Sequence, residues 1–417
     1  DADIVPHIQE KLKADIVAAY PSVPVKADDN VMESLYKVHE YTGDAFIFII
    51  DEWDAICREY DSGTRAMDDY VNWLRSMFKS VSASDVFAGV YLTGILPIKK
   101  YNTQSGLNNF VEYSMVQPVS MAKYFGFTKD EVRALATKYG MDFDELENQY
   151  DGYQIGDELS MFNPNSVMMA LHSRRCRSFW AATGSFDTVA GYIGMNYEGL
   201  KDDIIEMIAG GRCKVNTSRF GNDMRDIRSK NDVLTVLIHL GYLSYDRRKG
   251  ECYIPNREVA DEMVAAIEGN HWKEVADSLT RSEKLLAATL SGDEGAVAKG
   301  IEVAHYENTS ILSYNDENSL SCVLSLAYYY ARNDYVIHRE YATGKGFADL
   351  VMIPRKNVDS PALIIELKVG RDADTALDQI RRKEYPAKVA EYAGQLLLVG
   401  VNYDRETKQH TCRIEKA

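Results

Sequence analysis

Three charged residues near the end of this chain have the types and the spacing of a metal-dependent hydrolytic site. Asp349 lies in the apolar segment "GFADLVMIP", and Glu366 and Lys368 interrupt the next apolar segment, "ALIIELKV". Residues two apart in a strand point to the same face, so Glu366 and Lys368 should lie together. Carboxylates that converge on Mg²⁺ or Mn²⁺, with a cation beside the attacking water, can cleave a phosphodiester. We therefore predict that Asp349 and Glu366 hold the metal and that Lys368 orients or activates water.

The same pattern has a simpler interpretation. Glu366 and Lys368 could form an ion pair on a solvent-facing edge strand, which would contribute about 0 to 1 kcal/mol. The order of the segments favours the site instead, because a helix, the Asp349 strand, the Glu366 strand and a helix with basic residues follow one another. Ionised side chains in an apolar strand are otherwise costly unless a partner offsets their burial.

Asp, followed on the next strand by Glu-X-Lys, resembles the signature of the PD-(D/E)XK nuclease superfamily. The helix "ALDQIRRKEYPAKV" and the stretch "LLLVGVNYDRETKQHTCRIEKA" also resemble the nuclease domain attached to a bacterial AAA-ATPase-like family. The resemblance implies that Glu317, on the preceding helix, adds to the metal site, and that Gln379 lies beside the catalytic lysine or approaches a phosphate. Arg381, Arg382 and Lys383 form either a patch that binds nucleic-acid phosphates or a solvated helix face, and both interpretations stay open.

A second set of polar residues follows apolar strands in the N-terminal part. "FIFIIDEWD" contains Asp51 and Glu52, which match a Walker B strand, where the Asp organises Mg²⁺ and the Glu polarises water. The segments "FGFTKDEV", "YDGYQIG", "FNPNSVMMAL" and "FWAATGS" follow in the order of the AAA-ATPase-like family, so the chain resembles that family over nearly all its length. This implies that Thr93, at the end of the next strand, is a sensor residue for bound nucleotide. The alternative for Asp51 and Glu52 is a polar strand end that caps a helix.

The motif that would cradle the phosphates of ATP does not occur in this sequence. There is no G-x-x-x-x-G-K-[ST], and "TGKG" at 343–346 lacks the preceding Gly and the following Ser or Thr. Without those backbone N–H groups and the lysine, Asp51 and Glu52 have no triphosphate to act on, so we do not expect this chain to hydrolyse ATP. The phosphate loop of the family is expected upstream of residue 1, and ATP binding would require it.

The order of helical and strand patterns predicts an α/β multidomain protein. At about 150 residues per domain, 417 residues indicate two or three domains. We predict an incomplete AAA-ATPase-like α/β domain at 1–120 and a mostly helical region at 121–285. Within that region, the helix and hairpin at 231–256 are typical of a winged helix. Residues 286–417 return to α/β patterning and are predicted to be a domain with a restriction-endonuclease-like fold.

Charge and hydropathy narrow the class of protein. The formal net charge of −16 argues against a general nucleic-acid binder, because phosphate affinity depends on local basic surface. Any contact with nucleic acid should therefore be a confined patch. No apolar run approaches the ~20 residues needed to span a bilayer, which predicts a cytoplasmic protein without a membrane partner.

Three functions remain open at this point, and the first is favoured. The chain is a metal-dependent nuclease that acts on DNA in preference to RNA, an ATP-driven switch that carries an inactive nuclease fold, or a nucleic-acid-binding regulatory protein. A homo-oligomer is compatible with each of them.

Overall fold

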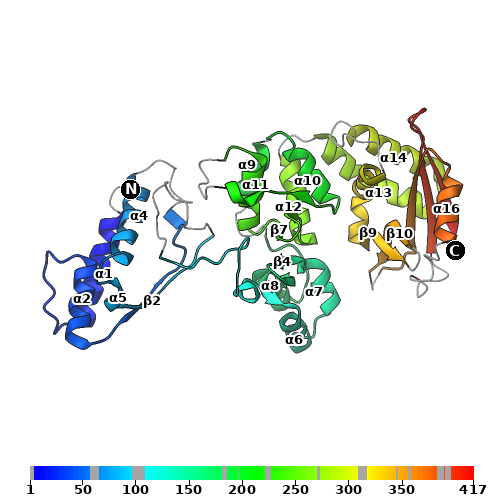
Figure 1. Cartoon of the computed structure of the whole chain (residues 1–417). Coiled ribbons are helices and arrows are strands. Elements are labelled where there is room, and N and C mark those ends of the chain that lie inside the picture. The colour runs from blue at the N-terminus through cyan, green and yellow to red at the C-terminus, as the bar shows by residue number, and fades with distance from the viewer. Residues whose placement is uncertain are drawn as a thin grey trace. The chain divides into compact units, whose positions relative to one another are not determined.

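The chain divides into two compact units (Figure 1). One comprises Asp1–Met121 and Thr217–Arg228, and the other comprises Ala122–Asn216 and Ser229–Ala417. The predicted division into three domains stays a prediction. The computed structural model describes residues 4–56, 65–95, 109–180, 186–195, 197–220, 227–269, 273–308, 317–343, 346–355, 358–382, 389 and 396–417.

The first unit is built on two parallel strands. β1 (Phe46–Ile50) pairs with β2 (Phe87–Leu92), and these two strands form a sheet of their own. Alternation along β1 turns Phe46, Phe48 and Ile50 toward the core, while Ile47 is 73% exposed. The helices of this unit are α1 (Ile4–Ala19), α2 (Val31–Thr42), α4 (Arg65–Phe78) and α5 (Ala83–Val86).

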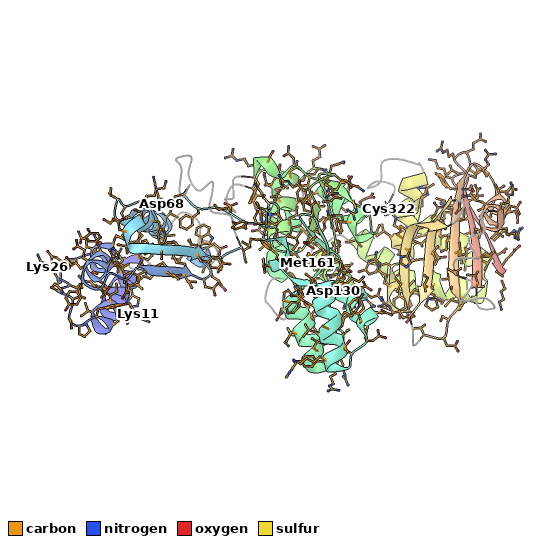
Figure 2. All side chains as sticks on the ribbon, turned by 60° about the horizontal axis from the view of Figure 1, so that its bottom comes forward. Lys11, Lys26, Asp68, Asp130, Met161 and Cys322 are labelled. Carbon is orange, nitrogen blue, oxygen red and sulfur yellow. The ribbon has the colours of Figure 1, made fainter. Side chains whose placement is uncertain are left out.

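The second unit begins with helices and small antiparallel sheets. Its first elements are η1 (Ala122–Tyr124), β3 (Phe127–Thr128), α6 (Lys129–Tyr139), α7 (Phe143–Tyr150), β4 (Tyr153–Ile155), β5 (Glu158–Phe162), α8 (Pro164–Ser173) and α9 (Phe186–Gly194). Side chains fill the interior of this unit in Figure 2, where Met161 on β5 and Cys322 in a later helix are labelled and both are buried. No helix among the described residues is both long and apolar enough to cross a membrane.

A helix and a hairpin follow where the sequence predicts them. The elements are α10 (Leu200–Ile208), β6 (Cys213–Lys214), α11 (Lys230–His239), β7 (Ser244–Asp246) and β8 (Glu251–Tyr253). The three strands form a sheet in the order β6-β8-β7, so the β7–β8 hairpin packs beside the strand that follows α10. A helix, a strand, a second helix and a hairpin follow one another here in the order of a winged helix; we refer to these elements as the winged-helix-like region, and its assignment stays a prediction.

The C-terminal part of the second unit is a five-stranded mixed sheet with helices on both faces. The strand order is β13-β12-β11-β10-β9, in which only β11 and β12 run parallel. Helices α13, α14 and α15 pack on one face of this sheet, and α16 packs on the other (Figure 1). The elements are α12 (Arg257–Gly269), α13 (Lys273–Ser291), α14 (Glu294–Asn308), α15 (Glu317–Ala327), η4 (Tyr329–Asn333), β9 (Tyr335–Thr343), β10 (Gly346–Pro354), β11 (Ala362–Val369), α16 (Ala373–Arg382), β12 (Leu396–Tyr403) and β13 (His410–Lys416).

Two arginines connect the edge of this sheet to the end of α10. Arg332, in η4, donates a hydrogen bond to the carbonyl of Ile208 at 2.9 Å, and Arg339, on β9, donates to the carbonyl of Ala209 at 3.3 Å. These carbonyls lie at the C-terminal end of α10, where the partial negative charge of a helix favours a cation. Burial lowers the pKa of Arg332, and the hydrogen bond to Ile208 offsets part of the cost of burying its charge.

Two buried histidines lie between α14 and the outer strands of the sheet. The rings of His305 and His410 are 5.1 Å apart, and each packs against the ring of Tyr403, at 4.6 and 4.8 Å. Glu302 accepts a hydrogen bond from the backbone N–H of His410 at 3.4 Å, and Cys412 lies two residues farther along the same strand. Burial, and then the neighbouring His305, lower the pKa of His410 from 6.5 to about 4.

His410 should therefore make the fold sensitive to acid. Because its pKa is lower in the folded state, its contribution to stability is present above pH 6.5 and is lost as the pH falls toward about 4. The wild-type free energy of unfolding should drop by up to ~3 kcal/mol more than that of a His410→Phe variant over this range. Urea denaturation at a series of pH values measures the difference, and His172→Gln, at an exposed histidine, is the control. A wild-type-minus-variant difference that does not change with pH would contradict the assignment.

Candidate active site

Glu366 lies in the middle of the C-terminal sheet with its carboxylate almost completely buried. On β11, Ile364 and Glu366 alternate onto the face that α16 covers, whereas Leu363, Ile365 and Leu367 face the opposite core. The side chain of Glu366 is 2% exposed, and the Nζ of Lys368 lies 3.1 Å from its Oε1. This places the ammonium next to the acid on one face of the strand, in contact with solvent through only 16% of the lysine side chain.

Asp349 is the neighbour of Glu366 on the adjacent strand. The pairing of Leu350 with Ile365 between β10 and β11, continued by one residue, puts Asp349 opposite Glu366. The half-buried carboxylate of Asp349 accepts a hydrogen bond through Oδ2 from the backbone N–H of Leu367 at 2.7 Å. The structure thus brings together the three residues that the spacing singled out, and the strand backbone fixes the position of Asp349.

Gln379 reaches this pair of strands from α16. Its Nε2 donates a hydrogen bond to Oε1 of Glu366, the same oxygen that faces Lys368. The helix can approach the sheet closely because Gly400, on β12, lies directly beside Glu366. A Cβ atom at Gly400 would lie only 2.3 Å from the carbonyl oxygen of Ala373 on α16. Gly400 was not among the predicted site residues, although a glycine inside the apolar run "LLLVGVNY" is a signal of close approach.

Asn402 is a second site residue that was not predicted. It is buried on β12 beside Lys368, and its Oδ1 accepts a hydrogen bond from the backbone N–H of Arg371 at 3.0 Å. Gly370, with φ of +64°, turns the chain there, and its N–H donates to the carbonyl of Tyr403 at 2.8 Å. Both hydrogen bonds hold the turn between β11 and α16, and therefore the elements that carry Lys368 and Gln379. A polar Asn in an otherwise apolar strand was the available signal.

The donor atoms of this site fit a hard divalent cation. Asp349 and Glu366 offer carboxylate oxygens, and Mg²⁺ typically binds through one or two protein carboxylates while keeping several waters. Glu317 is the first residue of α15, but its side chain lies outside the described residues, so its predicted role stays a prediction. Among the residues that the structure describes, no three His, Cys, Asp or Glu side chains form a group that could hold a metal.

The basic residues of α16 are engaged with acidic neighbours. Arg381 pairs with Asp378 at 2.9 Å and also with Glu415, and Arg382 lies 3.5 Å from Asp378. These side chains are half-exposed or exposed, and such pairs are weak, so they would not prevent contact with a phosphate. Lys383 lies outside the described residues.

Asp51, Glu52 and Thr93 also come together, at the carboxyl ends of β1 and β2. The hydroxyl of Thr93 donates to Oδ1 of Asp51 and accepts from the backbone N–H of Glu52 at 3.1 Å. Glu52 has φ of +50°, in the left-handed region that non-glycine residues seldom occupy. The geometry is compatible with either interpretation of these residues, and their role in binding nucleotide stays a prediction.

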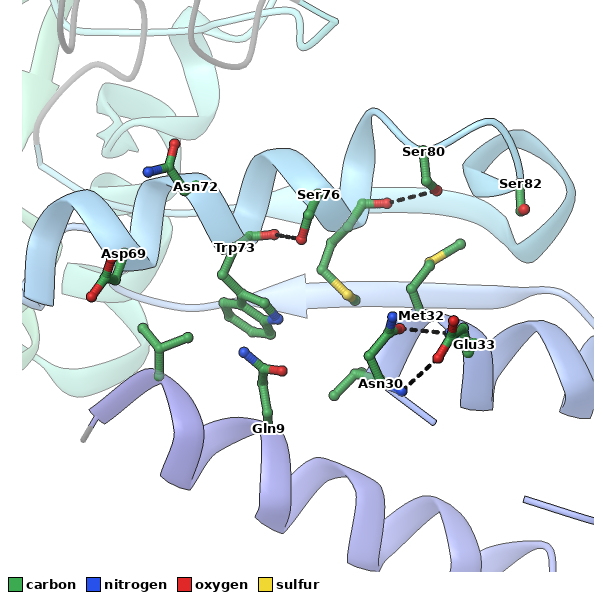
Figure 3. A pocket seen from close by; sticks show the side chains of 13 residues that line it. Gln9, Asn30, Met32, Glu33, Asp69, Asn72, Trp73, Ser76, Ser80 and Ser82 are labelled. Carbon is green, nitrogen blue, oxygen red and sulfur yellow. Dashed lines mark hydrogen bonds between the residues drawn. The ribbon is translucent and has the colours of Figure 1, made fainter. Parts of the chain in front are cut away.

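A cavity of about 500 Å³ in the first unit lies between α1, α2 and α4. Figure 3 shows Gln9 of α1 and Trp73 of α4 side by side in it. None of the residues predicted to contact nucleotide lines this cavity, and the described residues that do line it include Glu33 and Asp69 but no lysine or arginine. Its lining therefore does not favour a triphosphate.

Comparison with known proteins bears on the C-terminal part of the chain. Residues 316–412, which contain Asp349, Glu366, Lys368 and Gln379, match the family model described as PD-(D/E)XK nuclease superfamily. The chain is also similar to an uncharacterized protein in the vnfD 5' region of Azotobacter chroococcum mcd 1, with 22% identity over 396 residues, which cover 90% of this chain and 72% of that protein. No solved structure matches. The family match agrees with a mixed sheet that places Asp349 beside Glu366 and Lys368, and residues 316–412 are a C-terminal domain of the PD-(D/E)XK nuclease superfamily.

Proposed function

We propose that this domain cleaves the phosphodiester backbone of nucleic acid, DNA in preference to RNA, with Mg²⁺ or Mn²⁺ held by Asp349 and Glu366. The observation that carries the proposal is the arrangement of two acids and one base on neighbouring strands, with the Nζ of Lys368 3.1 Å from Glu366. A nuclease superfamily domain acts on nucleic acid, and the carboxylates of Asp349 and Glu366 would repel a phosphate unless a cation were bound between them.

Each residue of the site then has a distinct task. Asp349, held by the backbone N–H of Leu367, and Glu366, held by Gln379, present their carboxylates in fixed positions. A bound divalent cation would polarise the scissile phosphate and lower the pKa of a water molecule. Lys368 orients the attacking water or neutralises charge that develops on the phosphate. The pairing of Lys368 with Glu366 also explains why the strand tolerates both charges without substrate.

The first unit has a smaller part in this proposal. The hydrogen bond between Thr93 and Asp51 joins the carboxyl ends of two parallel strands, where ligands of α/β proteins commonly bind. We also propose that nucleotide binding in this unit regulates cleavage when the protein carries the phosphate loop of the ATPase-like family. The nuclease activity itself does not require this step.

The proposal is tested by nicking of supercoiled plasmid during a titration with divalent metal. We expect cleavage with Mg²⁺ or Mn²⁺ and none after chelation, because both carboxylates need the cation to bind the phosphate. A parallel reaction with single-stranded RNA of matched length tests the preference for DNA. Cleavage that is insensitive to chelation, or an inactive pure protein at every metal concentration, would refute the proposal.

A further inference from the structure

The second helix of the winged-helix-like region, α11, differs from the recognition helix of proteins that read DNA sequence. In helix-turn-helix proteins the recognition helix reaches the base edges through exposed side chains in the major groove. Here all residues of α11 are buried or half-buried, and the six from Val233 to Ile238 are buried in succession. Side chains on α11 are therefore occupied in the core of the second unit and cannot read bases.

The turn of the β7–β8 hairpin, in contrast, is exposed at Arg247, Arg248 and Lys249, and hydrogen bonds fix its backbone. The carboxylate of Asp246 accepts hydrogen bonds from the backbone N–H groups of Arg248 and Lys249 at 3.0 and 3.2 Å. Gly250 donates from its N–H to the carbonyl of Asp246 at 2.8 Å and has φ of +64°, which closes the turn. The backbone of the hairpin is thus ordered before any ligand arrives, which reduces the entropic cost of binding.

Four basic residues gather at this hairpin, and we name them the wing patch: Lys214, Arg247, Arg248 and Lys249. The last three follow one another in the turn with exposed side chains. Lys214, on the adjacent strand β6, joins them, because its Nζ donates to the carbonyl of Lys249 at 2.9 Å. The patch therefore spans the β7–β8 turn and the neighbouring strand β6 of the same sheet.

The acidic partners of the wing patch neutralise only part of its charge. Arg248 pairs with Asp157 at 2.6 Å, but the two side chains are 78% and 83% exposed. Lys214 pairs with Glu251 at 3.0 Å. An exposed ion pair such as Arg248–Asp157 is weak and exchanges readily with other anions. Within the described part of the chain, the side chains of Arg247 and Lys249 form no ion pair, so the patch is locally positive on a protein of net charge −16.

From these observations we propose that the wing patch binds the sugar–phosphate backbone of nucleic acid without reading its sequence. A rigid, exposed turn with consecutive cations suits a row of phosphates, whereas the buried α11 leaves no element to enter the major groove. Binding that depends on phosphate neutralisation is steeply salt-dependent and indifferent to sequence. The wing patch is separate from the cleavage site, so this binding does not depend on the nuclease proposal.

Fluorescence anisotropy with two short DNA duplexes of unrelated sequence, in chelator to prevent cleavage, tests the inference. The Arg247→Ala/Lys249→Ala variant should bind both duplexes about 10-fold more weakly than wild type, and the slope of log affinity against log salt should be less steep by about 2. Lys138→Ala/Arg175→Ala removes the same charge from exposed positions outside the hairpin and is the matched control. It should leave affinity and salt slope close to those of wild type.

Four outcomes would overturn the inference: no binding by wild type, unchanged binding by the wing variant, equal loss in the control variant, or wild-type affinity that differs strongly between the two duplexes. The result is distinguishable from failure of the proposed nuclease, because a protein without cleavage activity can still bind through the wing patch. Conversely, metal-dependent cleavage together with unchanged DNA binding by the Arg247→Ala/Lys249→Ala variant would support the proposed nuclease activity and refute binding through the wing patch.

Discussion

Replacing Glu366 with Gln is expected to abolish metal-dependent cleavage, with a loss of at least ~10³-fold. The substitution keeps the size of the side chain but removes one of the two carboxylates, those of Asp349 and Glu366, that are proposed to hold the metal. In the wild type the ammonium of Lys368 lies 3.1 Å from the Glu366 carboxylate, and the substitution leaves this ammonium beside a neutral amide. Asp349→Asn should have a similar effect, and the double variant should be no worse, because losses within one functional unit are not additive.

The measurement is the rate of plasmid nicking at saturating Mn²⁺, with metal affinity followed separately by calorimetry. Lys368→Ala should retain metal binding and still lose cleavage by ~10²-fold or more, since it removes a charge-stabilising group rather than a ligand. Asp378→Asn, at a half-exposed carboxylate on α16, is the control and should remain active. Nicking that persists unchanged in both Asp349→Asn and Glu366→Gln would mean that these residues are not the active site.

The second large effect is expected from Gly400→Ala. The added Cβ would lie 2.3 Å from the carbonyl oxygen of Ala373, which is backbone and cannot rotate away. The helix α16 must then move outward, and the hydrogen bond from Gln379 to Glu366 should be lost. Overpacking of this kind costs about 1 to 3 kcal/mol of stability.

We expect cleavage by Gly400→Ala to fall by more than its loss of stability explains, because the displaced helix carries Gln379. Urea denaturation and nicking assays at a temperature where the variant is folded separate the two effects. Gly191→Ala, on α9, is the matched control, since a Cβ there would meet no atom within 4 Å. Normal stability together with normal cleavage in Gly400→Ala would show that α16 does not depend on this close approach.

The difference between what the sequence predicted and what it missed follows from the range of the interactions. Glu366 and Lys368 share a strand, so period-two alternation alone puts them on one face. Asp349 lies on the preceding strand, from which an antiparallel neighbour is readily anticipated. The positions of Gly400 and Asn402 depend instead on the register of β12 with β11, two parallel strands joined through α16, and local sequence does not set that register.

In the winged-helix-like region, too, the sequence predicted the local elements but not the contacts between distant segments. The apolar run "VLTVLI" in α11 identifies a buried element, and the predicted helix and hairpin at 231–256 agree with the observed α11, β7 and β8. The pattern could not reveal that the helix is buried or half-buried along its whole length, because burial depends on how distant segments pack around it. The consecutive basic residues of the turn can be read directly from the sequence. That Lys214 lies beside them follows only from the pairing of β6 with β8.

The contact between the sheet and α10 determines where this chain can be cut. A fragment that begins near residue 286 would retain Arg332 and Arg339 but lack the carbonyls of Ile208 and Ala209 that now accept their hydrogen bonds. The half-buried Arg332 would then lack its carbonyl acceptor, or would turn into solvent and loosen η4 and the start of β9. Because β9 pairs with β10, which carries Asp349, such a fragment would be disturbed on the edge of the sheet nearest to its acids. Expression of the nuclease domain together with α10 therefore keeps the sheet intact.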